Sequence, residues 1–167
     1  SVQAAMLLNL LVTALTGVLV FLCARRLGVG QAAAVGIALI FGLATLAWPY
    51  AKYFFGEPLS GLTLLAAFYY LLCYRDERRW TSLWLAGLAL AGALAVKTAN
   101  AAAIPLFFLL LAVYEWPPAG AGSGRDLSGR DLLGYLRRLV LRSLPLAAPI
   151  LLAGGVTLAY NLLRFGA

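Results

Sequence analysis

The fold is decided by the first apolar stretch of the chain, residues 4–24, which reads AAMLLNLLVTALTGVLVFLCA and ends at Arg25 and Arg26. A helix needs about 20 apolar residues to cross the hydrocarbon core of a bilayer. This stretch reaches that length without one charged side chain. The sequence therefore predicts a membrane-spanning helix at the start of the chain.

Five further apolar stretches follow, at residues 31–48, 59–74, 81–96, 100–114 and 139–163. None of them alternates apolar and polar residues, as the strands of a membrane barrel do. We therefore expect an all-α fold, a polytopic membrane helix bundle with about six transmembrane helices. We expect it to form a single transmembrane domain over residues 1–167.

The composition supports the same class of protein. Hydrophobic residues make up 63% of the chain and charged residues only 11%, whereas a soluble domain has about 25% charged residues. This excludes a soluble enzyme, a nucleic-acid-binding module and a secreted domain held by disulfides. The net charge of +7 is typical of basic loops beside membrane spans and does not indicate a nucleic-acid partner. The sequence has no His, so no imidazole can serve as a base or a metal ligand.

The loops predict the orientation, because Lys and Arg gather on the cytoplasmic side of membrane proteins. Ten of the 13 basic residues follow the first, third and fifth stretches. They are Arg25, Arg26, Arg75, Arg78, Arg79, Arg125, Arg130, Arg137, Arg138 and Arg142. We therefore expect an integral membrane protein, of a bacterial plasma membrane, with both chain ends extracytoplasmic. We also expect the chain to be an internal fragment that lacks an upstream span and the first outer loop.

Small residues on two stretches predict close helix packing. A spacing of four residues places them on one helix face, where backbones can approach each other. The two sets are Ala34, Ala38 and Gly42, and Gly87, Ala91 and Ala95. The same spacing argument predicts a short amphipathic helix over about 128–138, with Ser128 and Asp131 in a capping pattern. Its leucines would face lipid and its arginines the anionic headgroups of the inner leaflet; an ordinary solvated connector is the alternative.

The outer side carries few charged residues, which makes them candidates for a site. Glu57 is the only acid there, since Asp76, Glu77, Glu115, Asp126 and Asp131 fall in or beside the arginine-rich loops. Lys52, Lys97 and Arg164 are the outer cations, and Asn100 and Asn161 lie close to two of them in sequence. Cations at this depth suit a lipid-linked phosphate. The alternative is that these charges only mark the headgroup region.

Three segments resemble GT-C membrane glycosyltransferases, most closely the branch of the protein mannosyltransferases and the lipid A aminoarabinose transferase. Residues 45–59, TLAWPYAKYFFGEPL, look like the second outer loop of that superfamily, and residues 85–97, LAGLALAGALAVK, look like the following small-residue helix with a basic end. Residues 159–166, AYNLLRFG, are similar to a stretch of uncharacterised bacterial members. The likeness covers nearly the whole chain.

The resemblance implies transfer of a sugar from a polyprenyl-phosphate donor to an acceptor on the outer side. It also implies that the catalytic base lies in the first outer loop, so the fragment alone should be inactive. We expect Glu57 to bind a divalent metal ion or to position the acceptor, and not to be the base. We expect Lys52, Lys97, Arg164, Asn100 and Asn161 to bind the substrate, with Lys97 and Arg164 on the phosphate. The bilayer and other membrane subunits are the further expected partners.

Two other functions remain open at this stage. A transporter or flippase segment is disfavoured because the middle of the spans carries no charge, and Asn9, Thr13, Thr16 and Thr45 are the only polar exceptions. A non-catalytic scaffold or assembly subunit needs only the small-residue faces.

Overall fold

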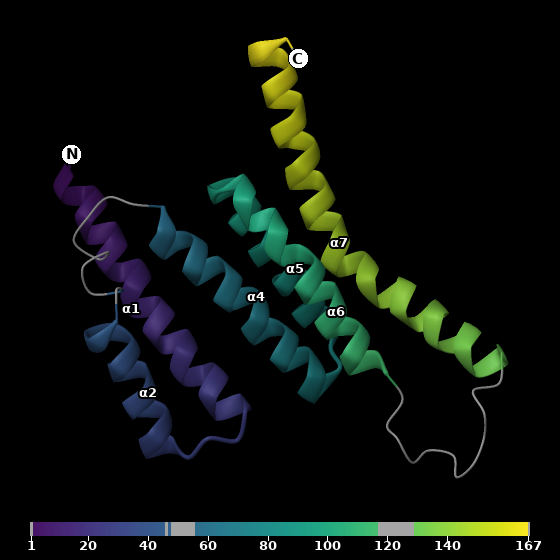
Figure 1. Ribbon diagram of the computed structural model, residues 1–167, viewed down its shortest axis with the longest axis horizontal. Coiled ribbons are helices and arrows are strands. Elements are labelled where there is room, and N and C mark those ends of the chain that lie inside the picture. Colours follow the sequence, from purple (N-terminus) through teal and green to yellow (C-terminus); the bar gives the residue numbers. More distant parts are fainter. Residues whose placement is uncertain (1, 46, 48–55, 117–128, 167) are drawn as a thin grey trace.

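The computed structural model describes residues 2–45, 47, 56–116 and 129–166, and this part of the chain is almost entirely helical and contains no strand. The predicted all-α membrane-type bundle is therefore confirmed. Consecutive helices run in opposite directions across the bundle (Figure 1). The elements are α1 (Val2–Arg26), α2 (Gln31–Ala44), α4 (Glu57–Glu77), α5 (Trp80–Val96), η1 (Thr98–Ala103), α6 (Ile104–Glu115) and α7 (Gly129–Phe165).

Each predicted span coincides with one of these helices. Three stretches are long and apolar enough to cross a membrane, Leu7–Arg26, Thr98–Glu115 and Leu132–Phe165, and α2 and α5 are shorter apolar helices. The chain is thus an integral membrane protein. One difference is in α2, which ends at Ala44, short of the predicted residue 48.

Local hydrogen bonds explain where α2 ends. The hydroxyl of Thr45 donates to the carbonyl oxygen of Phe41 (2.6 Å) and accepts from the backbone N–H of Ala47 (3.2 Å). Thr45 itself is extended, with φ −118° and ψ 178°. A side chain that bonds the backbone in this way offers it an alternative to the next helical hydrogen bond.

The fifth span begins differently from the prediction as well. Thr98–Ala103 form a 3-10 helix, and the α-helix starts only at Ile104, directly before Pro105. Proline has no N–H to donate and a fixed φ, so it is well placed in the first turn of an α-helix and poorly placed further along.

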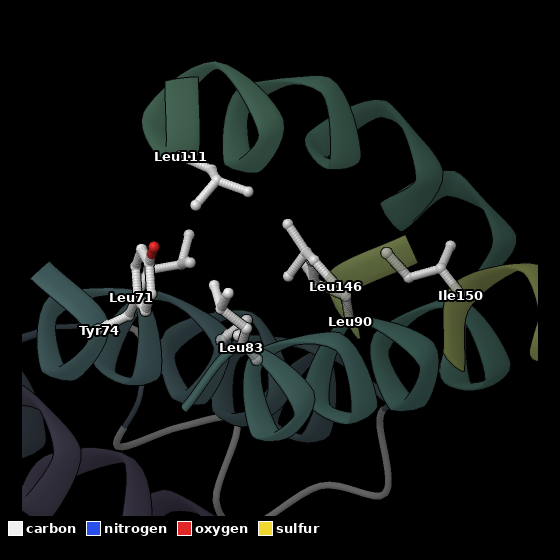
Figure 2. Close-up of a cluster of buried hydrophobic side chains, with 9 residues drawn as sticks. Leu71, Tyr74, Leu83, Leu90, Leu111, Leu146 and Ile150 are labelled. Atoms are coloured by element: carbon white, nitrogen blue, oxygen red, sulfur yellow. The ribbon is translucent and has the colours of Figure 1, made fainter. Parts of the chain in front are cut away.

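The core of the bundle lies between α4, α5, α6 and α7. Leu71, Tyr74, Leu83, Leu111 and Leu146 are each fully buried. Figure 2 shows these side chains converging from the four helices, with Leu146 of α7 reaching between its neighbours. Inside a bilayer, tight van der Waals packing of this kind holds helices together, because lipid is as apolar as leucine.

α5 and α7 approach each other closely at Gly87. A Cβ atom on Gly87 would lie 2.7 Å from the backbone oxygens of both Pro145 and Leu146. Pro149 lacks the N–H that would normally bond the carbonyl of Pro145 four residues earlier. The glycine therefore lets α5 pack directly against a bent part of α7. Of the other predicted small residues on this face, Ala91 is nearly buried and Ala95 is exposed.

Gly87→Ala is expected to destabilise the purified protein by about 1–3 kcal/mol, the usual cost of overpacking. The new methyl group has to push apart two backbones rather than a flexible side chain. The matched control is Gly92→Ala in the same helix, where the Cβ would meet only Thr63 Cγ2 at 3.5 Å. Thermal unfolding in detergent measures both variants. A midpoint for Gly87→Ala at or above that of Gly92→Ala would contradict the close approach.

α7 joins two predicted elements into one helix. The predicted helix over 128–138 is helical from Gly129 onward, and it continues without a break into the sixth span up to Phe165. Pro145 and Pro149 lie inside it, and the ribbon changes direction in this region (Figure 1), as prolines in a helix require. Leu132, Leu133 and Leu136 are exposed, whereas Tyr135 is buried and donates to the backbone oxygen of Ala112 (3.1 Å). Ser128, the predicted cap, lies outside the described residues.

One end of the bundle, here named the arginine-rich end, gathers Arg26, Arg75 and Arg78 with three acids. Arg26 pairs with Asp76 (3.3 Å) and Glu77 (2.8 Å), which ties α1 to α4. Arg75 donates a hydrogen bond to Asp76 (2.8 Å), and this contact, with that of Arg26, holds the pKa of the Asp76 carboxyl below its usual value. Asp76 and Glu77 thus balance the charge of the arginines that surround them.

Glu115 does more than balance charge. Its side chain is only 8% exposed, accepts a hydrogen bond from the Tyr74 hydroxyl and pairs with Arg78 at 2.7 Å. Arg78 also donates to the backbone oxygen of Tyr114 (2.8 Å). Glu115 therefore fixes the end of α6 against the end of α4.

Candidate functional site

Glu57 lies in the first turn of α4, at the end of the bundle opposite the arginine-rich end. A negative charge is favourable there because the helix dipole is positive at its N-terminus. Pro58 follows it, and its missing N–H is one of the donors that the first turn leaves unpaired in any case. The sequence thus places the Glu57 carboxylate at the N-terminus of α4, where a negative charge is most favourable.

Lys97 lies at the same end of the bundle, directly after the last residue of α5. It ends α5 in an extended conformation, with φ −155° and ψ 119°. Its Nζ lies 3.4 Å from Glu57 Oε1, and the two side chains are 55% and 49% exposed. The structure therefore brings together two of the four charged residues predicted to form a site on the outer side, and it leaves both accessible to a ligand.

Asn100 supports this pair from η1. Its amide Nδ2 donates to Ser60 Oγ (3.0 Å) and to the backbone oxygen of Ala93 (2.8 Å). These contacts connect the start of α4, the last turn of α5 and η1. Because the amide N–H groups are engaged by the protein, Asn100 is better placed to position Glu57 and Lys97 than to bind a substrate directly.

A cavity of about 530 Å³ opens beside Glu57, between α1, α2 and α4. Glu57, Pro58, Gly61 and Leu65 line it from α4, which corresponds to about 12 Å along the helix at 1.5 Å per residue. Its size is in the range of small-molecule sites, roughly 300–1,000 Å³. The lining of the other walls is Thr13, Thr16, Val20, Phe41, Thr45 and Ala47.

The three threonines of this cavity share one hydrogen-bonding pattern. Thr13 donates its hydroxyl proton to the backbone oxygen of Asn9 (2.8 Å), and Thr16 donates to that of Val12 (2.8 Å). Thr45 donates to Phe41 in the same way. Each hydroxyl proton is therefore used within its own helix, and each oxygen keeps acceptor capacity.

No positive role for these threonines was predicted from the sequence. Thr13, Thr16 and Thr45 entered only as polar exceptions in the argument against a transporter. The spacing of three residues between Thr13 and Thr16 does place them on one helix face, which is a signal. Their convergence with Thr45 and Glu57 depends on how α1, α2 and α4 pack, and the sequence does not show that.

Arg164 and Asn161 lie apart from this group. Both are exposed near the end of α7, which projects away from the start of α4 in Figure 1. The guanidinium of Arg164 donates to the Tyr160 hydroxyl and lies over the rings of Tyr160 and Phe165, all within the last turns of α7. Lys52 lies outside the described residues, so a cavity shared by all four charges stays a prediction.

A second, apolar cavity of about 510 Å³ lies between α1 and α2 and shares Thr13 with the first. Gly17, Ala38 and Gly42 line it. A Cβ on Gly17 or Gly42 would meet no atom within 4 Å. The small residues predicted for close packing on the second span therefore partly line an open groove, while Ala34, the first of that set, is fully buried.

A metal ion at Glu57 finds little support in these residues. The described part of the chain holds no group of three or more His, Cys, Asp or Glu side chains that could chelate one. Around Glu57 it offers one carboxylate and threonine hydroxyls. Magnesium is usually held by one or two carboxylates together with substrate phosphates, so this set fits a metal poorly without further ligands.

Comparison with known proteins gave one match. The sequence model of the family described as dolichyl-phosphate-mannose-protein mannosyltransferase matches residues 2–131. This range covers α1, α2, α4, α5 and α6, and hence the Glu57–Lys97 pair and the cavity beside it. No curated protein and no solved structure matches the chain.

Proposed function

This chain belongs to the dolichyl-phosphate-mannose-protein mannosyltransferase family, and from that premise we propose that it forms the part of a glycosyltransferase that presents an extracytoplasmic substrate site. The family makes it a membrane glycosyltransferase that takes a sugar from a polyprenyl-phosphate carrier. The acceptor side, the bacterial plasma membrane and the residue roles below are our proposal.

The observation that supports the proposal most is that the two ends of the helix bundle carry different charged groups. The arginine-rich end holds Arg26, Arg75 and Arg78 in ion pairs with acids. The opposite end holds the exposed Glu57–Lys97 pair and the cavity that Glu57 lines. Because Lys and Arg gather on the cytoplasmic side, the cavity belongs to the extracytoplasmic half of the bundle.

The chemistry of sugar transfer assigns different roles to the two charges. The acceptor hydroxyl loses a proton as it attacks the anomeric carbon, and the carboxylate of Glu57 accepts its hydrogen bond and positions it. The leaving lipid phosphate gains negative charge, and the Lys97 amine stabilises that charge. The contact of 3.4 Å between them keeps both groups within reach of one reacting centre.

Cysteine labelling tests the orientation on which the proposal rests. In a background with Cys23→Ala and Cys73→Ala, Thr98→Cys should react with a membrane-impermeant maleimide in intact cells, because Thr98 is exposed at the Glu57 end. Ser123→Cys, between α6 and α7 in the sequence, should react only after permeabilisation. Thr98 is a better reporter than Ser60, which is only 7% exposed. Labelling of Ser123→Cys from outside intact cells would refute the orientation.

A further inference from the structure

The cavity beside Glu57 has an unusual set of polar groups for a site that serves an anionic lipid. Its described lining contains no Lys or Arg. Its polar side chains are three threonine hydroxyls and one carboxylate. Since each threonine donates its own proton to a backbone carbonyl, the cavity presents hydrogen-bond acceptors to whatever enters it.

A cavity whose walls present hydrogen-bond acceptors favours a ligand that carries hydrogen-bond donors. A phosphate group is itself an acceptor with negative charge, so it would find neither a donor nor a cation among these walls and would be repelled by Glu57. A sugar ring carries several hydroxyl groups, each of which can donate. The polar groups also reach deep into the bundle, because Thr13 and Thr16 lie near the middle of α1 and Thr16 is only 6% exposed.

We propose that this cavity holds the sugar ring of the lipid-linked donor, whose hydroxyls donate to the oxygens of Thr13, Thr16 and Thr45, while the phosphate stays outside it near Lys97. This inference rests on the proposed function and makes it more specific. It divides the donor between two places: the ring in the threonine cavity, and the phosphate at the cation that ends α5. Thr13, Thr16 and Thr45 then determine which sugar-bearing lipids bind.

Binding measurements on the full-length protein in nanodiscs test whether the sugar ring and the phosphate are bound at these two separate places. The probes are dolichyl phosphate, dolichyl phosphate mannose and dolichyl phosphate glucose of one chain length. The wild type should bind at least one sugar-bearing probe more tightly than dolichyl phosphate. The double variant Thr13→Val and Thr16→Val, which keeps side-chain shape, should lose about tenfold in affinity for that probe, since two hydrogen bonds of ordinary strength are removed. Its affinity for dolichyl phosphate should not change.

Two further variants separate binding from structure. Thr157→Val is the matched control, because Thr157 in α7 donates to the backbone oxygen of Ala153 (2.9 Å) in the same pattern but does not line the cavity. It should bind all probes as the wild type does. The double variant Thr13→Ser and Thr16→Ser keeps both hydroxyls and should retain the preference for the sugar.

The outcomes separate this inference from the function on which it rests. If the valine double variant keeps the wild-type preference, or weakens all three probes equally, the threonines do not hold the sugar and the inference is overturned while the proposed function stands. If the wild type binds none of the probes and transfers no sugar, the proposed function fails and the inference fails with it.

Discussion

Glu57→Gln is expected to lower sugar transfer by the full-length protein at least ~10²-fold, the low end for loss of a charged group that acts on the transition state. Glutamine keeps the size of the side chain and loses the charge that orders the acceptor hydroxyl. It also loses the charge partner of Lys97 at 3.4 Å. The decrease should appear in kcat rather than in donor binding, because the carboxylate acts on the acceptor as it reacts.

The chain offers a matched control for this substitution. Glu77 is a partly exposed acid at the arginine-rich end, 35% exposed, and it pairs with Arg79 at 3.4 Å and with Arg26 at 2.8 Å. Glu77→Gln should leave the transfer rate within about twofold of the wild type, because surface ion pairs contribute little to stability. Transfer assays with a radiolabelled lipid-linked sugar measure both variants. Wild-type activity of Glu57→Gln would remove Glu57 from the site.

Lys97→Ala should have an effect of similar size, at least ~10²-fold on kcat, because the leaving phosphate then lacks the cation that stabilises its growing charge. Lys97→Arg keeps the positive charge and should recover most of the rate. The matched control is Arg79→Ala, since Arg79 begins α5 as Lys97 ends it and also pairs with a glutamate at 3.4 Å. A loss of activity in Arg79→Ala equal to that in Lys97→Ala would show that the effect comes from α5 and not from the site.

The helices could be predicted from the sequence because the apolar residues that form each one are contiguous in the chain. Apolar length and flanking arginines placed α1, α4 and α5 within a few residues. The early end of α2 was missed because it depends on the Thr45 hydroxyl competing for the backbone. The continuity of α7 was missed because the change from the amphipathic pattern of residues 128–138 to the apolar pattern of residues 139–163 was interpreted as a boundary between two elements, whereas one helix runs from Gly129 to Phe165.

The site was predictable only in part. Glu57 and Lys97 were identified by elimination, as rare charges on one side, and the structure places them 3.4 Å apart. The acceptor character of the cavity was not predictable. It depends on Thr13 of α1, Thr45 of α2 and Glu57 of α4 facing one space, which is a property of helix packing. Glu115 received no role beyond its place beside the arginine-rich loops, because nothing in the sequence indicates that the Tyr74 hydroxyl donates to it.

The length of α7 determines how the protein adapts to membranes of different thickness. Its 37 residues extend about 55 Å at 1.5 Å per residue, well beyond a hydrocarbon core of about 30 Å. The part that follows Arg142 is about 34 Å long by the same rise, so it matches the core, and the bend at Pro145 and Pro149 falls near the start of this part, toward the arginine-rich end. Beyond that bend, Leu151 and Leu152 are more than 70% exposed. Hydrophobic mismatch can therefore be taken up by a change in tilt of this outer arm. The described walls of the Glu57 cavity come from α1, α2, α4 and Ala47, so that cavity should keep its shape in thin and thick bilayers alike.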